Sequence, residues 1–188
     1  MITVAVIGMG GRGRRLTREA KALGAKIVAV CDANIHLVRE EFNNYDIPEN
    51  MLFSSDDEFF KAGKLADLLI IATQDALHYK HAMAACECGY DCVLEKPIST
   101  DYARCEEICN KANEKGVKIF VCHSMRYMPF FEKVKEIVDS GKIGEIRLLI
   151  RPKTWDIGIL LTHSSAESGQ KLRTQRPRLS QSAVTIST

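Results

Sequence analysis

The chain has 188 residues, of which 46% are hydrophobic and 27% charged, a composition typical of a globular protein with room for one core and part of a second. Its formal net charge of +2 argues against a nucleic acid or a membrane surface as partner, because such partners need clustered basic residues. No apolar run approaches the roughly 20 residues of a membrane span, and no basic leader precedes the apolar start, so we expect a cytoplasmic protein.

The chain begins with a strand, a glycine cluster and a helix. Residues 4–7 are a continuous apolar run, which predicts a parallel strand buried on both faces. The helix that follows is predicted to end at Gly24, before a second strand at residues 26–31. Its expected apolar face consists of Leu16, Ala20 and Leu23.

The same alternation of helices and strands continues to residue 122 and predicts an α/β fold, a doubly wound parallel sheet of the Rossmann type. Short connections favour right-handed crossovers between its six strands. The further helices are predicted at residues 36–43, 56–62, 77–88 and 101–115, and the further strands at residues 51–53, 66–72, 92–95 and 118–122.

The pattern changes after residue 122, where only the start of a second, α+β domain is predicted. An amphipathic helix around Phe131, Val134, Ile137 and Val138 ends at Gly141, and a strand follows at residues 146–150. We therefore divide the chain into a dinucleotide-binding domain (1–122), the beginning of a substrate or oligomerisation domain (123–163) and a tail (164–188). The tail is rich in Ser, Thr, Gln and Arg and has almost no apolar periodicity.

The seven cysteines have no spacing typical of a metal site. The closest pair, Cys86 and Cys88, is separated by a single residue. We expect buried free thiols and no metal.

The segment from Gly8 to Gly13 matches the G-x-G-x-x-G pattern of dinucleotide-binding turns. It lies between a predicted strand and a predicted helix, whose N-terminus favours phosphate. Asp32 follows Gly13 by 19 positions, close to the spacing of an acid that binds the cofactor ribose. A carboxylate there favours NAD and repels the extra phosphate of NADP, although the nearby Arg39 leaves NADP as the less favoured alternative. The expected cofactor contacts in this region are Gly8, Gly10, Gly11, Arg12, Gly13 and Asp32.

Four arginines follow the glycine pattern closely, and either of two interpretations fits them. They can assist the phosphates, or they can form a solvated helix face, which is the simpler interpretation. The four are Arg12, Arg14, Arg15 and Arg18.

Two groups of polar residues come just past the ends of predicted strands, at the edge where open α/β sheets bind ligands. They are Thr73, Gln74, Asp75 and His78 in the first group, and Glu95, Lys96 and Pro97 in the second. Lys96 at this edge can protonate or polarise a substrate oxygen. The alternative interpretation is a surface lysine at a turn before proline.

Taken together, these residues resemble the Gfo/Idh/MocA family of sugar and inositol dehydrogenases over residues 1–163. The matching features, in the family's order, are the Gly8–Gly13 pattern, Cys31-Asp32, Ala72-Thr73 with His78, Glu95-Lys96-Pro97, Arg126-Tyr127 with Pro129, and residues 141–146.

The resemblance implies an NAD(P)-dependent oxidoreductase that transfers a hydride between the cofactor and a sugar-like or cyclitol alcohol. Lys96 would be the catalytic residue at the reacting hydroxyl, Glu95 would support it, and the Lys96–Pro97 bond would be cis. The family's second domain usually adds an aspartate and a histidine and commonly forms a homo-oligomer contact. Further cofactor contacts are expected from Thr73, Gln74, His78, Glu95, Lys96 and Arg126.

The tail allows a specific hypothesis. Read one base earlier, the codons of Ser164 to Thr188 can encode a segment that ends in Cys-Cys-His-Asp-Ile-Asp, which resembles the family's continuation with its histidine and aspartate. A frameshift near His163 is therefore our hypothesis for residues 164–188, and a divergent disordered tail is the alternative. Sequencing the coding DNA across this region decides between them.

Two other functions remain as alternatives to a dehydrogenase. One is a non-catalytic NAD(H)-binding module, which would bind cofactor without turnover. The other is an NAD-dependent glycosidase of the same family, which oxidises and re-reduces its substrate in place and shows no net turnover of cofactor.

Overall fold

A computed structural model describes residues 1–36, 39 and 45–145 of the chain. The chain divides into two compact units, Met1–Met125 and a second that begins at Arg126. The strands are β1 (Thr3–Ile7), β2 (Lys26–Cys31), β3 (Leu52–Phe53), β4 (Leu68–Ile71), β5 (Asp91–Leu94) and β6 (Ile119–Val121). The helices are α1 (Gly11–Ala22), α3 (Asp56–Lys61), α4 (His78–Glu87), α5 (Tyr102–Lys115) and α6 (Pro129–Asp139), with 3-10 turns η1 (Glu49–Met51), η2 (Asp75–Leu77) and η3 (Ser124–Tyr127).

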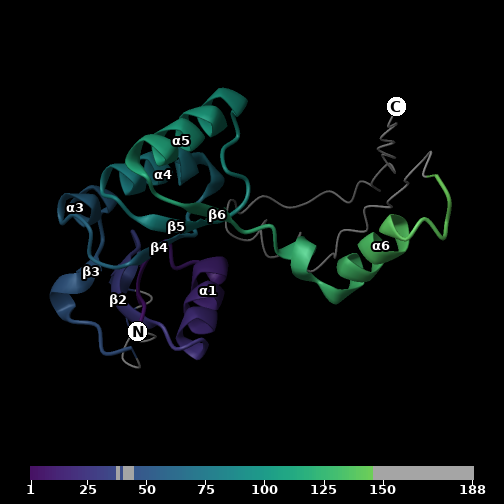
Figure 1. Cartoon of the computed structure of the whole chain (residues 1–188). Coiled ribbons are helices and arrows are strands. Elements are labelled where there is room, and N and C mark those ends of the chain that lie inside the picture. Colours follow the sequence, from purple (N-terminus) through teal and green to yellow (C-terminus); the bar gives the residue numbers. More distant parts are fainter. Residues whose placement is uncertain (37–38, 40–44, 146–188) are drawn as a thin grey trace, which may run out of the picture. The chain divides into compact units, whose positions relative to one another are not determined.

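The first unit is one parallel sheet of six strands, as the alternation of elements predicts, and the structure places them in the order β3-β2-β1-β4-β5-β6. Helix α1 packs on β1, β2 and β4, whereas α4 packs on β4, β5 and α5, so the sheet is covered from both sides (Figure 1). The strand order reverses between β1 and β4. Open α/β sheets bind their ligands at such a point, beyond the carboxyl ends of the strands.

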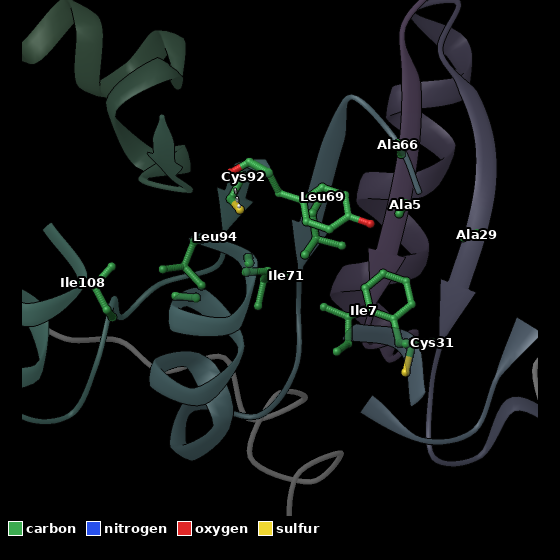
Figure 2. Close-up of a cluster of buried hydrophobic side chains, with 14 residues drawn as sticks. Ala5, Ile7, Ala29, Cys31, Ala66, Leu69, Ile71, Cys92, Leu94 and Ile108 are labelled. Carbon is green, nitrogen blue, oxygen red and sulfur yellow. Dashed lines mark hydrogen bonds between the residues drawn. The ribbon is translucent and has the colours of Figure 1, made fainter. Parts of the chain in front are cut away.

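The core has one half on each face of the sheet, because successive strand residues point to opposite faces. In β1, Val4 and Val6 pack with Leu16 and the rest of the α1 side. Ala5 and Ile7 instead join the cluster beneath α3, α4 and α5, part of which is drawn in Figure 2. Each large side chain buried in this way contributes about 1.5–3 kcal/mol relative to leaving it in water.

Most predicted elements are confirmed within a few residues, and two details differ. The prediction that Leu23 belongs to the buried face of the first helix is wrong, because α1 ends at Ala22 and Leu23, its C-cap, is 89% exposed. The helix predicted at residues 77–88 begins as the separate turn η2 and continues as α4. Most of the helix predicted at 36–43, the strand at 146–150 and the tail at 164–188 lie outside the described residues.

The second unit contains the predicted amphipathic helix as α6, which ends at Asp139 with Ser140 as its C-cap. Most of its apolar side chains, such as those of Phe130 and Val134, are exposed, whereas Phe131 is half-buried. In the described ranges, no helix is long and apolar enough to cross a membrane. All seven cysteines are free thiols, as predicted, but only Cys31, Cys86 and Cys92 are buried, and Cys109 is exposed.

Candidate functional site

The turn from β1 into α1 requires glycine at two positions. Gly8 has a φ of +90°, and a Cβ there would lie 2.7 Å from the backbone of Ala72 and Thr73, just past the end of β4. A Cβ on Gly13 would lie 1.9 Å from the carbonyl oxygen of Gly8. Both contacts are shorter than real Cβ atoms tolerate, so the turn holds β1, α1 and β4 together through close backbone approach.

Gly10 and Gly11 meet no such crowding, since nothing lies within 4 Å of a Cβ at either position. Gly10 is the N-cap of α1, a helix of 12 residues with no acidic residue in its first turn and no side-chain cap. The first backbone N–H groups of the helix are thus left without intrahelical partners at the positive end of its dipole. This is the geometry that binds an anion such as a phosphate.

Asp32 connects the end of β2 to this turn. Its Oδ2 accepts a hydrogen bond from the Met9 amide at 2.6 Å, and its Oδ1 accepts one from the Asn34 amide at 2.8 Å. A carboxylate has about four acceptor positions. Asp32 therefore keeps capacity for two further donors, as the two hydroxyls of a ribose require.

The turn, Asp32 and the end of β4 surround a cavity of about 570 Å³. This volume lies in the range of small-molecule and cofactor sites. Of the residues predicted to contact the cofactor, those that line the cavity are Gly8, Gly10, Asp32, Thr73 and Gln74.

Arg12 and Glu95 form a pair outside the cavity lining. Two guanidinium nitrogens of Arg12 lie 2.9 and 2.7 Å from Glu95 Oε1, and the Glu95 side chain is only 5% exposed. The pair joins the glycine turn to the end of β5. Lys96 itself is exposed, its amide lies 3.3 Å from Glu95 Oε2, and the Lys96–Pro97 peptide is cis, as the resemblance implies.

The remaining predicted contacts also lie outside the cavity lining. His78 is fully buried, with Nδ1 donating to the Pro97 carbonyl at 2.6 Å and Nε2 3.2 Å from the Thr73 carbonyl, so it links the ends of β4 and β5. Gly11 and Gly13 belong to the first turn of α1. Arg126 is exposed in η3, at the start of the second unit. Arg39 forms an ion pair with Glu49.

Several lining residues were not predicted as contacts of the cofactor. Arg14 was favoured as part of a solvated face, but it lines the cavity and its Nε donates to the Met9 carbonyl at 2.9 Å. The position of Asp56 after β3, at the carboxyl edge of the sheet, was a usable signal. The other unpredicted lining residues with polar or sulfur-containing side chains are Met9, Cys31, Asn34, Ser54 and His81.

Electrostatics distinguish these groups. Hydrogen bonds from Lys80 and then His81 lower the pKa of Asp56 to about 2, so it is a carboxylate at neutral pH. Burial lowers the pKa of His81, and this effect outweighs the hydrogen bond and the charge of Asp56, which raise it. Burial, with help from the Asp56 charge, raises the pKa of Cys31 to about 12, so this thiol is not a nucleophile at neutral pH.

Comparison with known proteins agrees with this geometry. Residues 2–123 match the model of the Gfo/Idh/MocA family, described as "Oxidoreductase family, NAD-binding Rossmann fold". The chain is 30% identical over 145 residues to 2,7-anhydro-N-acetylneuraminate hydratase of Mediterraneibacter gnavus, covering 76% of this chain and 37% of the relative. It is 27% identical over 151 residues to inositol 2-dehydrogenase of Azotobacter vinelandii, covering 79% and 44%.

Among solved structures, the WlbA dehydrogenase from Bordetella pertussis, in complex with NADH and UDP-GlcNAcA, is similar with a TM-score of 0.69 and 26% identity. The match covers 78% of this chain and 44% of that structure. The chain thus spans less than half the length of these relatives. Because the family model covers the whole described sheet, from the start of β1 to the end of β6, the chain belongs to the Gfo/Idh/MocA oxidoreductases, a family with an NAD-binding Rossmann fold.

Proposed function

We propose that the Met1–Met125 unit binds a nicotinamide dinucleotide in the cavity and serves hydride transfer to or from the CH–OH group of a sugar-like or cyclitol alcohol. The observation that carries this proposal is the contrast within the glycine turn. Crowding requires Gly8 and Gly13, whereas the space at Gly10 and Gly11 opens onto the N-terminus of α1. A pyrophosphate group fits there, because the backbone can approach it closely.

In this proposal the pyrophosphate and the ribose of the cofactor are held by different groups of the chain. Backbone N–H groups at the start of α1 bind the pyrophosphate, and Arg14, which lines the cavity, adds positive charge. Asp32 accepts hydrogen bonds from ribose hydroxyls and repels a 2′-phosphate, so NAD is preferred to NADP. When bound, the cofactor supplies or accepts the hydride.

Lys96 is our proposed catalytic residue. It is exposed two residues after the end of β5, at the same carboxyl edge of the sheet as the cavity. Its ammonium group would exchange a proton with the reacting hydroxyl as the hydride moves. The buried Glu95, held by Arg12, would fix the backbone from which Lys96 extends. A sugar-like or cyclitol substrate is proposed from the names of the relatives, two of which are a hydratase of an anhydro-sugar acid and an inositol dehydrogenase.

Calorimetric titration of the whole chain with NADH and, separately, NADPH tests the binding step. We expect micromolar binding of NADH and much weaker binding of NADPH. Asp32→Ala should narrow the difference between the two cofactors, whereas Asp67→Ala, which removes an exposed carboxylate bonded to Thr3, is the matched control and should not. Failure to bind either cofactor would overturn the proposal.

The hydride-transfer step has its own test. The chain is mixed with NAD and a panel of inositols and sugar acids, and the absorbance of NADH is followed. Turnover that disappears in Lys96→Met while NADH affinity is kept supports the assignment of Lys96. Because the lining of the cavity lies entirely within the Met1–Met125 unit, binding without net NADH formation would point instead to the two alternatives, a non-catalytic NAD(H)-binding module or a glycosidase that re-reduces its substrate in place. Release of sugar from a glycoside would distinguish the glycosidase from the module.

A further inference from the structure

A chain of hydrogen bonds runs along one side of the cavity and joins three side chains. Thr73, just past the end of β4, places Oγ1 2.9 Å from Nδ1 of His81 on α4. The other ring nitrogen, Nε2, lies 3.0 Å from Oδ2 of Asp56, the first residue of α3. All three residues line the cavity, and His81 is only 1% exposed.

The acceptors decide where the protons of this chain lie. Asp56 also accepts a hydrogen bond from Lys80 at 2.8 Å and is ionised at neutral pH, so it can only accept from His81. Nε2 of His81 therefore carries the hydrogen. In the neutral ring Nδ1 is then an acceptor, and the Thr73 hydroxyl must donate to it.

We propose that His81 and Asp56 are positioning residues that hold the Thr73 hydroxyl as a hydrogen-bond acceptor facing the cofactor. This inference rests on the proposed function. Since the hydroxyl proton of Thr73 is directed to His81, only the lone pairs of Oγ1 remain for a ligand in the cavity. Such an oxygen binds donors, namely the ribose hydroxyls or the carboxamide NH₂ group, and disfavours phosphate oxygens, which only accept. The device thus fixes which part of the dinucleotide lies beside β4.

Protonation of His81 would reverse this polarity. Nδ1 would then donate to Thr73, and the hydroxyl proton of Thr73 would turn toward the cavity. The charged groups around His81 are Asp56 from α3, which favours the proton, and Lys80 and His78 from its own helix, which disfavour it. Asp57 faces Lys80 rather than the ring. Because burial is the largest influence and keeps the ring neutral, the acceptor state prevails at neutral pH.

The test is the pH profile of affinity for NAD⁺, which is stable in acid, measured by calorimetry on the whole chain between about pH 5 and 8. Wild-type affinity should fall on acidification by about 3- to 10-fold, the value of one hydrogen bond. Thr73→Val should lose a similar factor at neutral pH and show no further loss in acid. Thr73→Ser should restore both the affinity and its pH dependence.

Two further measurements separate positioning from a general effect on folding. Thr3→Val removes the hydroxyl of a different threonine, which donates to the Asp67 carboxylate outside the cavity, and should leave the profile unchanged. In the wild-type chain, ¹⁵N NMR of the His81 ring at neutral pH should show the Nε2–H tautomer. This measurement uses the wild-type chain and so does not depend on whether a variant folds.

Either of two results would overturn the inference while leaving the proposed function intact: NAD⁺ binding whose strength and pH profile are the same in Thr73→Val, or an Nδ1–H tautomer of His81. Absence of binding by the wild-type chain at every pH would overturn the proposed function, and the inference with it.

Discussion

The two walls of the cavity are built on opposite principles. The wall from β1 into α1 depends on absent side chains, because Gly8 and Gly13 allow backbone atoms to approach where any Cβ would collide. The wall at the end of β4 depends on present side chains, because Thr73, His81 and Asp56 are fixed by hydrogen bonds. The first wall should therefore respond to added volume and ignore pH, whereas the second should respond to protonation.

The largest expected effect is that of Gly13→Ala. The new methyl group would lie 1.9 Å from a backbone oxygen, which cannot move without displacing β1. We expect a loss of more than about 3 kcal/mol in the free energy of unfolding, measured by urea denaturation. Gly11→Ala is the matched control in the same turn, with open space around its Cβ, and should change stability by less than about 1 kcal/mol. Equal stability of the two variants would refute the steric account.

Arg12→Met tests whether the turn also needs a side chain. It leaves the buried Glu95 carboxylate without its guanidinium partner, so we expect a loss of about 1–3 kcal/mol in the free energy of unfolding. Arg15→Met removes an exposed pair with Glu19 and should cause no measurable loss. If both variants melt like the wild type, the link between the turn and β5 does not contribute to stability.

Gly10→Ala should separate binding from folding. Nothing crowds its Cβ, and its φ of −65° suits alanine. Because alanine is a poorer N-cap than glycine, the free energy of unfolding should fall slightly, by less than about 1 kcal/mol. The methyl group would occupy the space through which the backbone approaches a pyrophosphate, and NADH affinity should fall by about tenfold in calorimetry. Unchanged affinity would mean that the anion does not lie over this turn.

The smallest effect concerns the acid dependence of stability. The pKa of His81 is lowered in the folded chain, so the unfolded chain binds its proton first and stability should decline as pH falls below about 6.5. Asp56, whose pKa is lowered to about 2, adds stability that is present above its ordinary pKa and is lost as pH falls toward 2. Asp56→Asn should cost about 1 kcal/mol at neutral pH in urea denaturation and should flatten the decline in strong acid. An unchanged acid slope in this variant would exclude Asp56 as its source.

Features that depend on neighbours in the chain were predictable from the sequence, whereas features that depend on contacts between separate elements were not. The strands, the turn and Asp32 were predicted because each depends on neighbours in the chain: an apolar run, a glycine spacing or a position at the end of a strand. The prediction that Leu23 is buried was wrong because helical periodicity shows which face of a helix is apolar but not how far along the helix the sheet covers that face. The placement of His78 away from the cavity likewise depends on a carbonyl contributed by Pro97, in another loop.

The sequence by itself determined the order of strands and helices, the glycine turn at the start of α1 and an acid beside it, since these are local consequences of side-chain volume and backbone freedom. Only the tertiary structure decided that Asp56 and His81, 25 positions apart, share a hydrogen bond, and that Arg12 reaches Glu95 across 83 positions. Those contacts exist because the carboxyl ends of β1, β3, β4 and β5 meet at one edge of the sheet, and no local pattern records how near two side chains come when separate elements pack.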